Sequence, residues 1–504
     1  MEVTDTRRWL ALGAMAMAML TIGLDVTVLT IALPTLAVDL NAGTSALQWF
    51  STAYTLVLAA AMLPAGALGD RYGRKKVLMS AMVLFGIASA ASAFAATAGQ
   101  LIAARALLGL AAAAMMPLSM AMLPVLFPDA DARNKAMAIW VTANGIGMPL
   151  GPLLGGWLLR NFWWGSVFLI NIPVVALGFA AVAFLVPETR SAQRNPIDLP
   201  GVALSGAGML GLTYGFIRAG EQSWTDAVAW ISVAAGVALL AAFLAWQRRA
   251  AHPLIDTGLF ADRAFRWGTV YSTLIMFAMF GMFFTVPQYF QAILGVDALG
   301  SGLRLLPLIA GLTVGAKLGE RITAKAGVRV TLLAGFAVMA AGLGLGALTD
   351  VDSGYGFTAV WIVVTGLGMG FAMPAAMGLA LGAITAERAG SASALLQALR
   401  QAGGTVGVAV LGTVLATQYR SELGPLDRAP ISDGVNAGVA VAHRLGDSAV
   451  LAQVQTAFVG GMGLMLWVCA GICVVSLAVV AATTRAADTP VRSLDKAESV
   501  HAGP

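Results

Sequence analysis

The chain has 504 residues, of which 59% are hydrophobic and 11% are charged, and its formal net charge is +5. A soluble domain carries about 25% charged residues, so this composition excludes a chain whose main solvent is water and predicts an integral membrane protein. Its two cysteines and three histidines form no disulfide or metal-binding pattern, and we expect neither a metal nor an organic cofactor.

Apolar runs between polar breaks predict an all-α membrane protein with fourteen transmembrane helices, since one span takes about 20 residues. The predicted spans lie near 9–33, 47–69, 77–97, 100–127, 134–158, 164–187, 197–218, 227–247, 266–290, 299–319, 328–348, 357–384, 390–417 and 457–483. An even number of spans places both termini on the same side of the membrane.

The positions of the basic residues predict which side that is. If the termini are cytoplasmic, 21 of the 30 lysines and arginines fall in inner segments and five fall in outer ones. This bias follows the positive-inside rule and predicts cytoplasmic termini. It also accounts for the net charge without a nucleic-acid partner.

Within the first predicted helix, Asp25 is the one acid that we find well inside a span. It lies about 12 Å below the outer end of helix 1, and Arg105 lies about 9 Å below the outer end of helix 4. These similar depths predict that the two residues meet. Burial disfavours a charged carboxylate and a neighbouring arginine favours it, so movement of Arg105 would switch Asp25 between proton uptake and release. The alternative is a fixed structural ion pair.

The loop after helix 2, residues 66–76, combines glycines with one acid and several bases. We expect its charge cluster to act as a conformational latch that holds one half of the molecule against the other. The alternative is a solvated basic loop that merely follows the positive-inside rule. With the corresponding loop after helix 10, the predicted latch residues are Gly66, Asp70, Arg71, Gly73, Arg74, Glu320 and Arg321.

Helix 5 carries a run of glycines and prolines at 145–156. The glycines fall on a four-residue step, which leaves a bare face for close helix packing, and the prolines bend the helix. A simple packing face is the plain interpretation of this pattern. Its central residues are Gly147, Gly151, Pro152, Gly155 and Gly156.

A repeated motif predicts two homologous halves. Leu-Gly-Asp-Arg at 68–71 recurs as Leu-Gly-Glu-Arg at 318–321, in each case after a helix that ends at the cytoplasmic side. Helices 1–6 then match helices 9–14, and helices 7 and 8 are inserted between them. The predicted organisation is a six-helix bundle at 1–190, two inserted helices at 191–250, a cytoplasmic linker at 251–265, a six-helix bundle at 266–484 with an external loop at 418–456, and a cytoplasmic tail at 485–504.

Together these motifs resemble the major facilitator superfamily, and in particular its fourteen-span drug:proton antiporters. The loop at 66–76 resembles the signature loop of the superfamily, the segment 101–109 resembles its helix-4 motif, and the segment 145–156 resembles its antiporter motif. The segment 24–34 resembles the helix-1 motif of the drug:proton antiporters. The resemblance implies a major facilitator fold with two six-helix bundles and two inserted helices.

The same resemblance implies a function. We expect a proton-coupled antiporter that exports small amphiphilic drugs or antibiotics across a bacterial cytoplasmic membrane by alternating access. We expect a monomer that contacts membrane lipids, uses protons as its coupling ion and has no enzyme activity. By analogy with the family, the candidate residues of the substrate cavity are Tyr54, Met115, Asn144, Phe168, Asn171, Phe280, Phe284, Gln288, Gln397, Arg400 and Gln401.

The sequence departs from some relatives in the charges of its second half. Several relatives carry a second acid in helix 10 or helix 13 that serves cationic drugs. Here helix 10 contains Arg304 and helix 13 contains Arg400. We therefore expect a preference for neutral or anionic compounds over dications.

Two other functions stay open from the sequence. A lipid or glycolipid exporter uses the same fold, and the inserted helices would suit a lateral opening. The alternative of another class is a membrane receptor or scaffold that transports nothing, against which the repeat and the helix-5 motif argue.

Overall fold

The computed structural model describes residues 5–127, 129–189, 198–382, 384 and 388–484. These residues form helices and short 3-10 turns, and no strand occurs among them. This is the expected outcome for apolar segments in lipid, where a helix satisfies its backbone hydrogen bonds internally.

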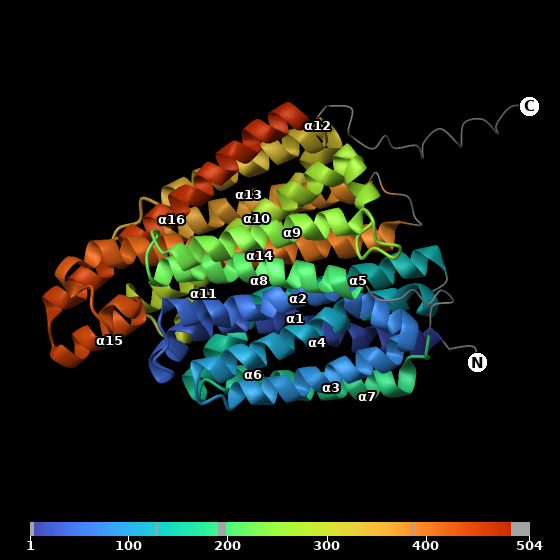
Figure 1. Ribbon diagram of the computed structural model, residues 1–504, viewed down its shortest axis with the longest axis horizontal. Coiled ribbons are helices and arrows are strands. Elements are labelled where there is room, and N and C mark those ends of the chain that lie inside the picture. The colour runs from blue at the N-terminus through green and yellow to red at the C-terminus, as the bar shows by residue number, and fades with distance from the viewer. Residues whose placement is uncertain (1–4, 128, 190–197, 383, 385–387, 485–504) are drawn as a thin grey trace, which may run out of the picture.

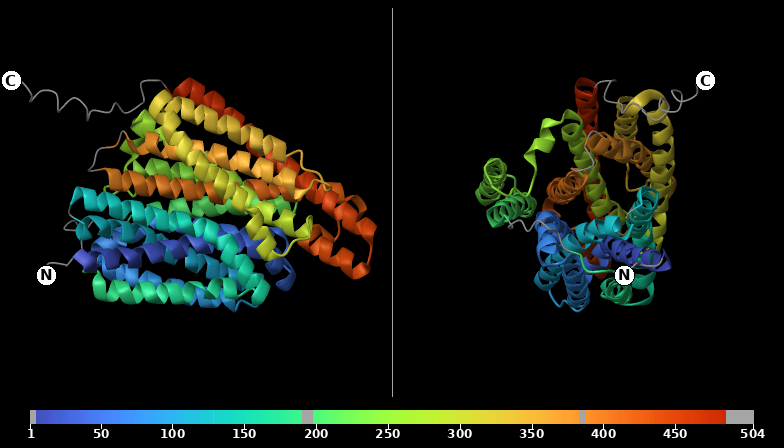
Figure 2. Two further views of the ribbon diagram at one scale, coloured as in Figure 1. Left: turned by 180° about the vertical axis from the view of Figure 1, so that it is seen from behind. Right: turned by 90° about the vertical axis from the view of Figure 1, so that its right-hand side faces the viewer.

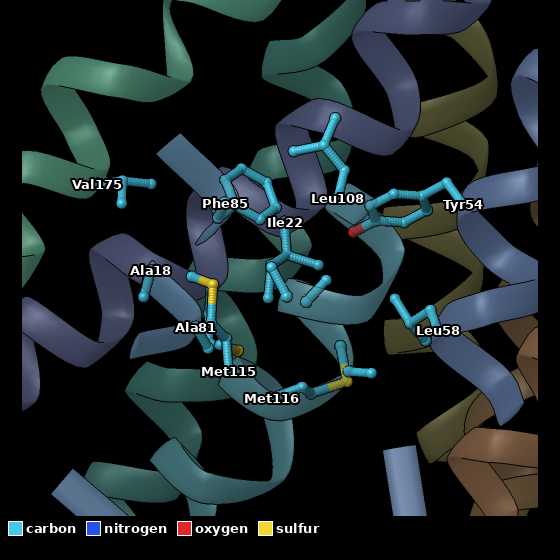
Figure 3. Packing of buried hydrophobic residues seen from close by; sticks show 14 of the residues in the cluster. Ala18, Ile22, Tyr54, Leu58, Ala81, Phe85, Leu108, Met115, Met116 and Val175 are labelled. Carbon is cyan, nitrogen blue, oxygen red and sulfur yellow. The ribbon is translucent and has the colours of Figure 1, made fainter. Parts of the chain in front are cut away.

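The first half of the chain forms one helical bundle (Figure 1). Its seven helices make six crossings. Side chains from several of its helices, among them Ile22, Phe85, Leu108 and Met115, pack together in its core (Figure 3). The sixth crossing is divided into two helices. The helices are α1 (Asp5–Asp39), α2 (Thr44–Tyr72), α3 (Arg74–Ala93), α4 (Ala98–Leu126), α5 (Ala130–Asn161), α6 (Ser166–Leu169) and α7 (Asn171–Leu185).

The second half forms a bundle around its own hydrophobic core. Its longest helix contains two crossings, because the backbone turns sharply at Gly327. The helices are α10 (Arg263–Ala292), α11 (Ala298–Arg304), α12 (Leu306–Gly346), α13 (Tyr355–Gly382), α14 (Ala389–Leu423), α15 (Val435–Leu445) and α16 (Ser448–Thr483), with 3-10 turns η1 (Thr257–Ala261), η2 (Gly424–Leu426) and η3 (Ile431–Asp433).

Two helices are inserted between the halves, α8 (Leu199–Glu221) and α9 (Ala227–Gln247). They lie on one flank of the molecule (Figure 2), where α8 packs against both α2 and α14. The Thr413 hydroxyl donates a hydrogen bond of 2.7 Å to the Phe216 carbonyl oxygen. This contact ties α8 to the second bundle.

Asp198 joins the two inserted helices at one end. Its carboxylate accepts hydrogen bonds from the Trp246 indole at 2.8 Å and the Gln247 amide at 2.7 Å. Burial acts to raise the pKa of Asp198, but these bonds and one from the Gly201 amide outweigh it, so the pKa lies below its usual value. Gln247 in turn accepts a hydrogen bond of 3.0 Å from the Ile255 amide in the segment that follows α9.

The predicted major facilitator architecture with fourteen crossings agrees with this arrangement. Among the described residues, twelve stretches are long and apolar enough to cross a membrane, and one of them, 298–346, holds two crossings. The 32-residue helix α5 supplies the remaining one. The repeat also has a structural counterpart, because Gly73 and Gly327 take positive φ angles of 114° and 85° at equivalent turns.

The segment between α14 and α16 is shorter than the external loop that we predicted from residues 418–456. Helix α14 continues to Leu423 and α16 begins at Ser448. Polar residues extend both helices by bonding to one another, as when the Gln453 amide donates a hydrogen bond of 2.6 Å to the Glu422 carbonyl oxygen. The polar residues at 418–423 and 448–456 therefore belong to helices that continue beyond their apolar runs.

The molecule has two distinct ends. The described chain begins and finishes at one of them, here called the terminal end, and α15 lies at the other, the α15 end (Figure 1). The bundles touch closely at the α15 end. A Cβ added at Gly156 of α5 would lie 2.6 Å from the Leu299 Cα of α11, and one at Gly302 would meet the Pro152 carbonyl oxygen.

Candidate functional site

A buried ion pair lies at the centre of the first bundle. The Arg105 guanidinium donates to the Asp25 carboxylate at 2.5 Å, and both side chains are only 1% exposed. Asp25 comes from α1 and Arg105 from α4. The similar depths that the sequence predicts for them correspond to a direct contact in the structure. An unpaired charge in a span costs about 2.5–3.5 kcal/mol, which this pairing offsets.

Three further helices complete the surroundings of the pair. The Asn171 amide on α7 donates to the second Asp25 oxygen at 3.0 Å, and it also approaches the Ser89 hydroxyl on α3 at 3.4 Å. On α2, the Phe50 carbonyl oxygen accepts a hydrogen bond of 3.0 Å from the Arg105 Nε. The Asp25 carboxylate thus accepts hydrogen bonds from side chains on two other helices, α4 and α7.

Tyr54 packs directly on the arginine. The Arg105 guanidinium carbon lies 4.5 Å from the centre of the Tyr54 ring, a cation–π contact. The Tyr54 hydroxyl is buried and has no hydrogen-bond partner among the described residues. Gly109 makes the approach of α2 to α4 possible, because a Cβ there would collide with the Tyr54 carbonyl oxygen. Tyr54 and Asn171, predicted to line the substrate cavity, are therefore partners of the Asp25–Arg105 pair.

Arg105 also borders a cavity between the two bundles. The space within it amounts to about 490 Å³, the solvent at its mouth included. Its walls come from α1, α2 and α4 of the first bundle and from α10 and α14 of the second, and they include Thr30, Thr55, Phe280, Phe283 and Phe284. One side chain thus connects the buried acid with the space between the bundles.

The other predicted cavity residues lie elsewhere in this conformation. Met115 points into the core of the first bundle (Figure 3). Phe168 is buried in the same core. Gln288 lies near α15, where its side-chain oxygen accepts a hydrogen bond of 3.3 Å from Asn436. The side chain of Asn144 lies outside the described residues.

Gln397, Arg400 and Gln401 are neighbours on α14. The Gln397 side chain approaches the Met116 sulfur of α4 at 3.9 Å, so this part of α14 faces the first bundle. The Gln401 side chain is buried, and its backbone oxygen accepts a hydrogen bond of 3.0 Å from Thr405. Thr405 contacts Thr55 of α2 at 2.7 Å across the boundary between the bundles.

The predicted latch residues bond within the first bundle in this structure. Arg74 pairs with Asp70 at 2.8 Å and donates to the Ala121 carbonyl oxygen at 3.1 Å. Gly73 provides the turn between α2 and α3 with a φ of 114°. In the corresponding turn of the second half, Glu320 and Arg321 are exposed. The remaining members, Gly66 and Arg71, lie on α2, with Arg71 stacked on the ring of Tyr72 at 5.5 Å.

The helix-5 motif packs on two different partners. Added Cβ atoms at Gly147, Gly151 and Gly155 would all meet α1, and the one at Gly151 would collide with the Thr27 hydroxyl. Gly156 and the carbonyl oxygen of Pro152 instead face α11 of the second bundle. The motif therefore holds α5 against α1 and also closes the α15 end.

Sequence reasoning missed several residues of this network. Glu188 accepts hydrogen bonds from the Lys75 and Lys76 amides at 3.1 and 3.2 Å, which caps α3 beside the latch loop. Gln48 crosses the boundary between the bundles and donates to the Val408 and Ala409 carbonyl oxygens at 3.2 and 3.1 Å. Glu188 directly follows the sixth span and is opposite in charge to the basic loop at 66–76. This position in the sequence could have indicated the contact of Glu188 with that loop.

The sequence matches the Major Facilitator Superfamily over residues 15–408. The chain belongs to this family. It is therefore a multi-pass membrane transport protein and not an enzyme.

Its relatives include bacterial resistance and export proteins. The tetracenomycin C resistance and export protein of Streptomyces glaucescens is 32% identical over 95% of this chain and 92% of its own length. The multidrug efflux pump LfrA of Mycolicibacterium smegmatis is 33% identical over 89% of this chain and 88% of its own length. The methyl viologen resistance protein SmvA of Salmonella typhimurium is 32% identical over 83% of this chain and 84% of its own length.

Solved structures share the fold. A bacterial homologue of the human lysosomal transporter Spinster, in an inward-facing and occupied conformation, matches with a TM-score of 0.70 over 97% of this chain and 100% of its own. A POT family transporter matches with a TM-score of 0.63 over 94% of this chain and 96% of its own. Both are 14% identical to this chain, so the likeness concerns the fold alone.

Proposed function

We propose that the protein exports small amphiphilic drugs or antibiotics across the bacterial cytoplasmic membrane in exchange for protons. The observation that carries the proposal is the buried Asp25–Arg105 pair, of which Arg105 also borders the cavity between the bundles. Relatives over most of the chain are named for export of, or resistance to, such compounds.

The pair supports a coupling mechanism. Proton binding to Asp25 removes the charge that holds Arg105, which frees the guanidinium to move relative to the cavity. Binding of substrate in the cavity and binding of a proton to Asp25 then affect each other, because Arg105 borders the cavity and also pairs with Asp25. Alternating access follows if the two occupancies favour different arrangements of the bundles.

We further propose that the terminal end faces the cytoplasm, as the distribution of basic residues predicts. In that orientation the structure is closed toward the outside, through the contact of α5 with α11. The protein would act as a monomer in the lipid bilayer, with the Asp70–Arg74 network as a latch that engages the second bundle when the cytoplasmic side closes.

The proton gradient supplies enough energy for this exchange. Moving one charge across about 150 mV yields roughly 3.5 kcal/mol. Since about 1.4 kcal/mol corresponds to a tenfold ratio of concentrations, one proton per neutral substrate sustains a gradient of a few hundredfold.

The test is proton movement in proteoliposomes that contain the full chain. The neutral amide of pyrenebutyrate, an uncharged aromatic amphiphile, is added as the probe and internal pH is followed. The wild type should release or take up protons in response to the probe, and Asp25→Asn should not. Asp39→Asn is the matched control, because Asp39 lies on the same helix but is exposed. Undiminished probe-driven proton movement in Asp25→Asn would refute the coupling role.

A further inference from the structure

Arg400 is a cation in the membrane-spanning helix α14, and no carboxylate among the described residues pairs with it. Its terminal nitrogen donates to the Gln397 side-chain oxygen at 2.8 Å and approaches the Met377 sulfur at 3.5 Å. Its Nε is buried and has no partner among the described residues. No ion pair joins it to an acid in the described part of the chain.

The other arginines within the predicted spans differ from it. Arg105 is paired with Asp25. Arg304 lies at the α15 end, where its guanidinium carbon is 5.1 Å from the centre of the Tyr355 ring. It is therefore not part of the cavity wall, and the expected positive charge of the second half rests on Arg400. A charged side chain in a span is costly and is retained where it has a partner or a function.

Apart from the Gln397 side-chain oxygen, the acceptor that contacts the Arg400 side chain among the described residues is a thioether sulfur. Gln397 orients Arg400 with its oxygen, and the nearest partner of its own amide is the Met116 sulfur at 3.9 Å. Thioether sulfur accepts hydrogen bonds poorly, so the donors of both side chains stay largely unsatisfied. Met116 belongs to the first bundle and Met377 to the second, which places this group of donors at the boundary between the bundles.

The position along α14 connects this group with the cavity. Gln397, Gln401, Thr405 and Val408 succeed one another at helical spacing on the face that meets the first bundle. Arg400 lies beside this face, about 17 Å along the helix from Ala389, and Val408 lines the cavity further on. A compound that passes from the terminal end to the cavity along this face meets Arg400 first.

We infer that Arg400, held in place by Gln397, binds an acidic group of the transported compound, a carboxylate or a phenolate. A guanidinium has five donors in a planar fork that matches two oxygen atoms, whereas it offers no acceptor to a cation. Met116 and Met377 supply polarisable surface for the apolar part of the same molecule. The inference rests on the proposed export function and specifies its substrate class.

The test compares two ligands that differ only in charge. Pyrenebutyrate and its neutral amide share one ring system and chain, and pyrene fluorescence reports their binding to the detergent-solubilised full chain. The wild type should bind the carboxylate about 10- to 100-fold more tightly, as expected for one charge-assisted bidentate contact. Arg400→Gln should abolish this preference while binding of the amide stays unchanged, which also shows that the variant is folded.

Two further variants sharpen the result. Arg400→Lys keeps the charge without the fork and should retain only part of the preference. Arg304→Gln makes the same substitution in the arginine near Tyr355 and should leave the preference intact. Methyl viologen, a dication, should bind more tightly to Arg400→Gln than to the wild type.

The inference is overturned if the wild type shows no preference for the carboxylate, or if Arg400→Gln weakens both ligands equally. Binding in detergent needs no proton gradient, so this outcome is independent of coupling. A carboxylate preference that depends on Arg400, combined with probe-driven proton movement that survives in Asp25→Asn, would support the binding site and refute the proposed coupling.

Discussion

The amide of Asn171 donates a hydrogen bond of 3.0 Å to the Asp25 carboxylate from the first residue of α7. Arg105 occupies the other carboxylate oxygen. The acid is thus held from two sides by donors on different helices. If Arg105 moves away as proposed, Asn171 is the contact that keeps the carboxylate in position.

Asn171→Ala should therefore slow probe-driven proton movement. Without the Asn171 amide the Asp25 carboxylate loses one of its two donors, and a hydrogen bond to a charged group contributes roughly 1.5–3 kcal/mol. We expect the rate of probe-driven proton movement in proteoliposomes to fall about tenfold. Asn161→Ala, at an exposed asparagine that bonds to its own helix, should leave this rate in place. A wild-type rate in Asn171→Ala would show that the hydrogen bond to Asp25 does not serve the coupling.

Asp70→Asn should slow turnover a few-fold and leave substrate affinity nearly unchanged. Asp70 holds Arg74, which in turn bonds to α4, and a half-exposed pair contributes about 0.2–1 kcal/mol. Because these residues lie far from the cavity, the substitution should slow the exchange between conformations and should not weaken substrate binding. Transport rate and probe affinity, measured on the same preparation, separate the two. A collapse of affinity with an unaltered rate of exchange would contradict the latch.

Gly156→Ala should hold the α15 end open. The new Cβ would lie 2.6 Å from the Leu299 Cα and 2.7 Å from the Ala298 carbonyl oxygen, and these backbone atoms cannot yield without moving α11. Ile31, fully buried near this contact, reports the change when replaced by cysteine. Its labelling by an impermeant maleimide should increase several-fold. The native Cys469 and Cys473 are buried and give little background.

Gly86→Ala is the control for this experiment. A Cβ at Gly86 would meet nothing within 4 Å, so labelling at Ile31→Cys should stay at the level of the parent protein. Equal labelling in the Gly156 and Gly86 variants would show that the α5–α11 contact does not govern closure.

Asp198→Asn should weaken the attachment of the inserted helices and alter the acid sensitivity of the fold. The pKa of Asp198 is lowered in the folded protein. Its charged form therefore stabilises the fold above the pKa of an unfolded aspartate, about 3.9, and this contribution is lost as the pH falls through the folded value. At pH 7 the variant should unfold a few degrees lower.

Thermal unfolding of wild type and variant at pH 7 and at pH 3 checks this prediction. The difference between them should shrink at the lower pH, because the contribution of the charged form decreases below the pKa of an unfolded aspartate, about 3.9. An equal difference at both pH values would show that the charge of Asp198 contributes nothing to stability.

The sequence alone determined which segments form long apolar helices and how far along its helix each residue lies. Lipid requires long apolar helices, and a helix rises by a fixed amount per residue, so position in the sequence translates directly into depth. For this reason the depths of Asp25 and Arg105, each counted from the outer end of its helix, predicted that the two residues meet. The sequence also placed Gly73 in the loop after helix 2, where a helix end needs a residue that tolerates a positive φ.

Only the tertiary structure decided which way each helix turns its faces. In lipid the apolar circumference of a helix carries little periodic signal, so rotation about the axis is set by packing with neighbours. Met115 and Phe168 therefore point into the first bundle, while Gln288 lies near α15 and Arg304 against Tyr355. The partners Asn171 and Ser89 depend on helices remote in sequence that meet only in the fold, and no local pattern encodes that meeting.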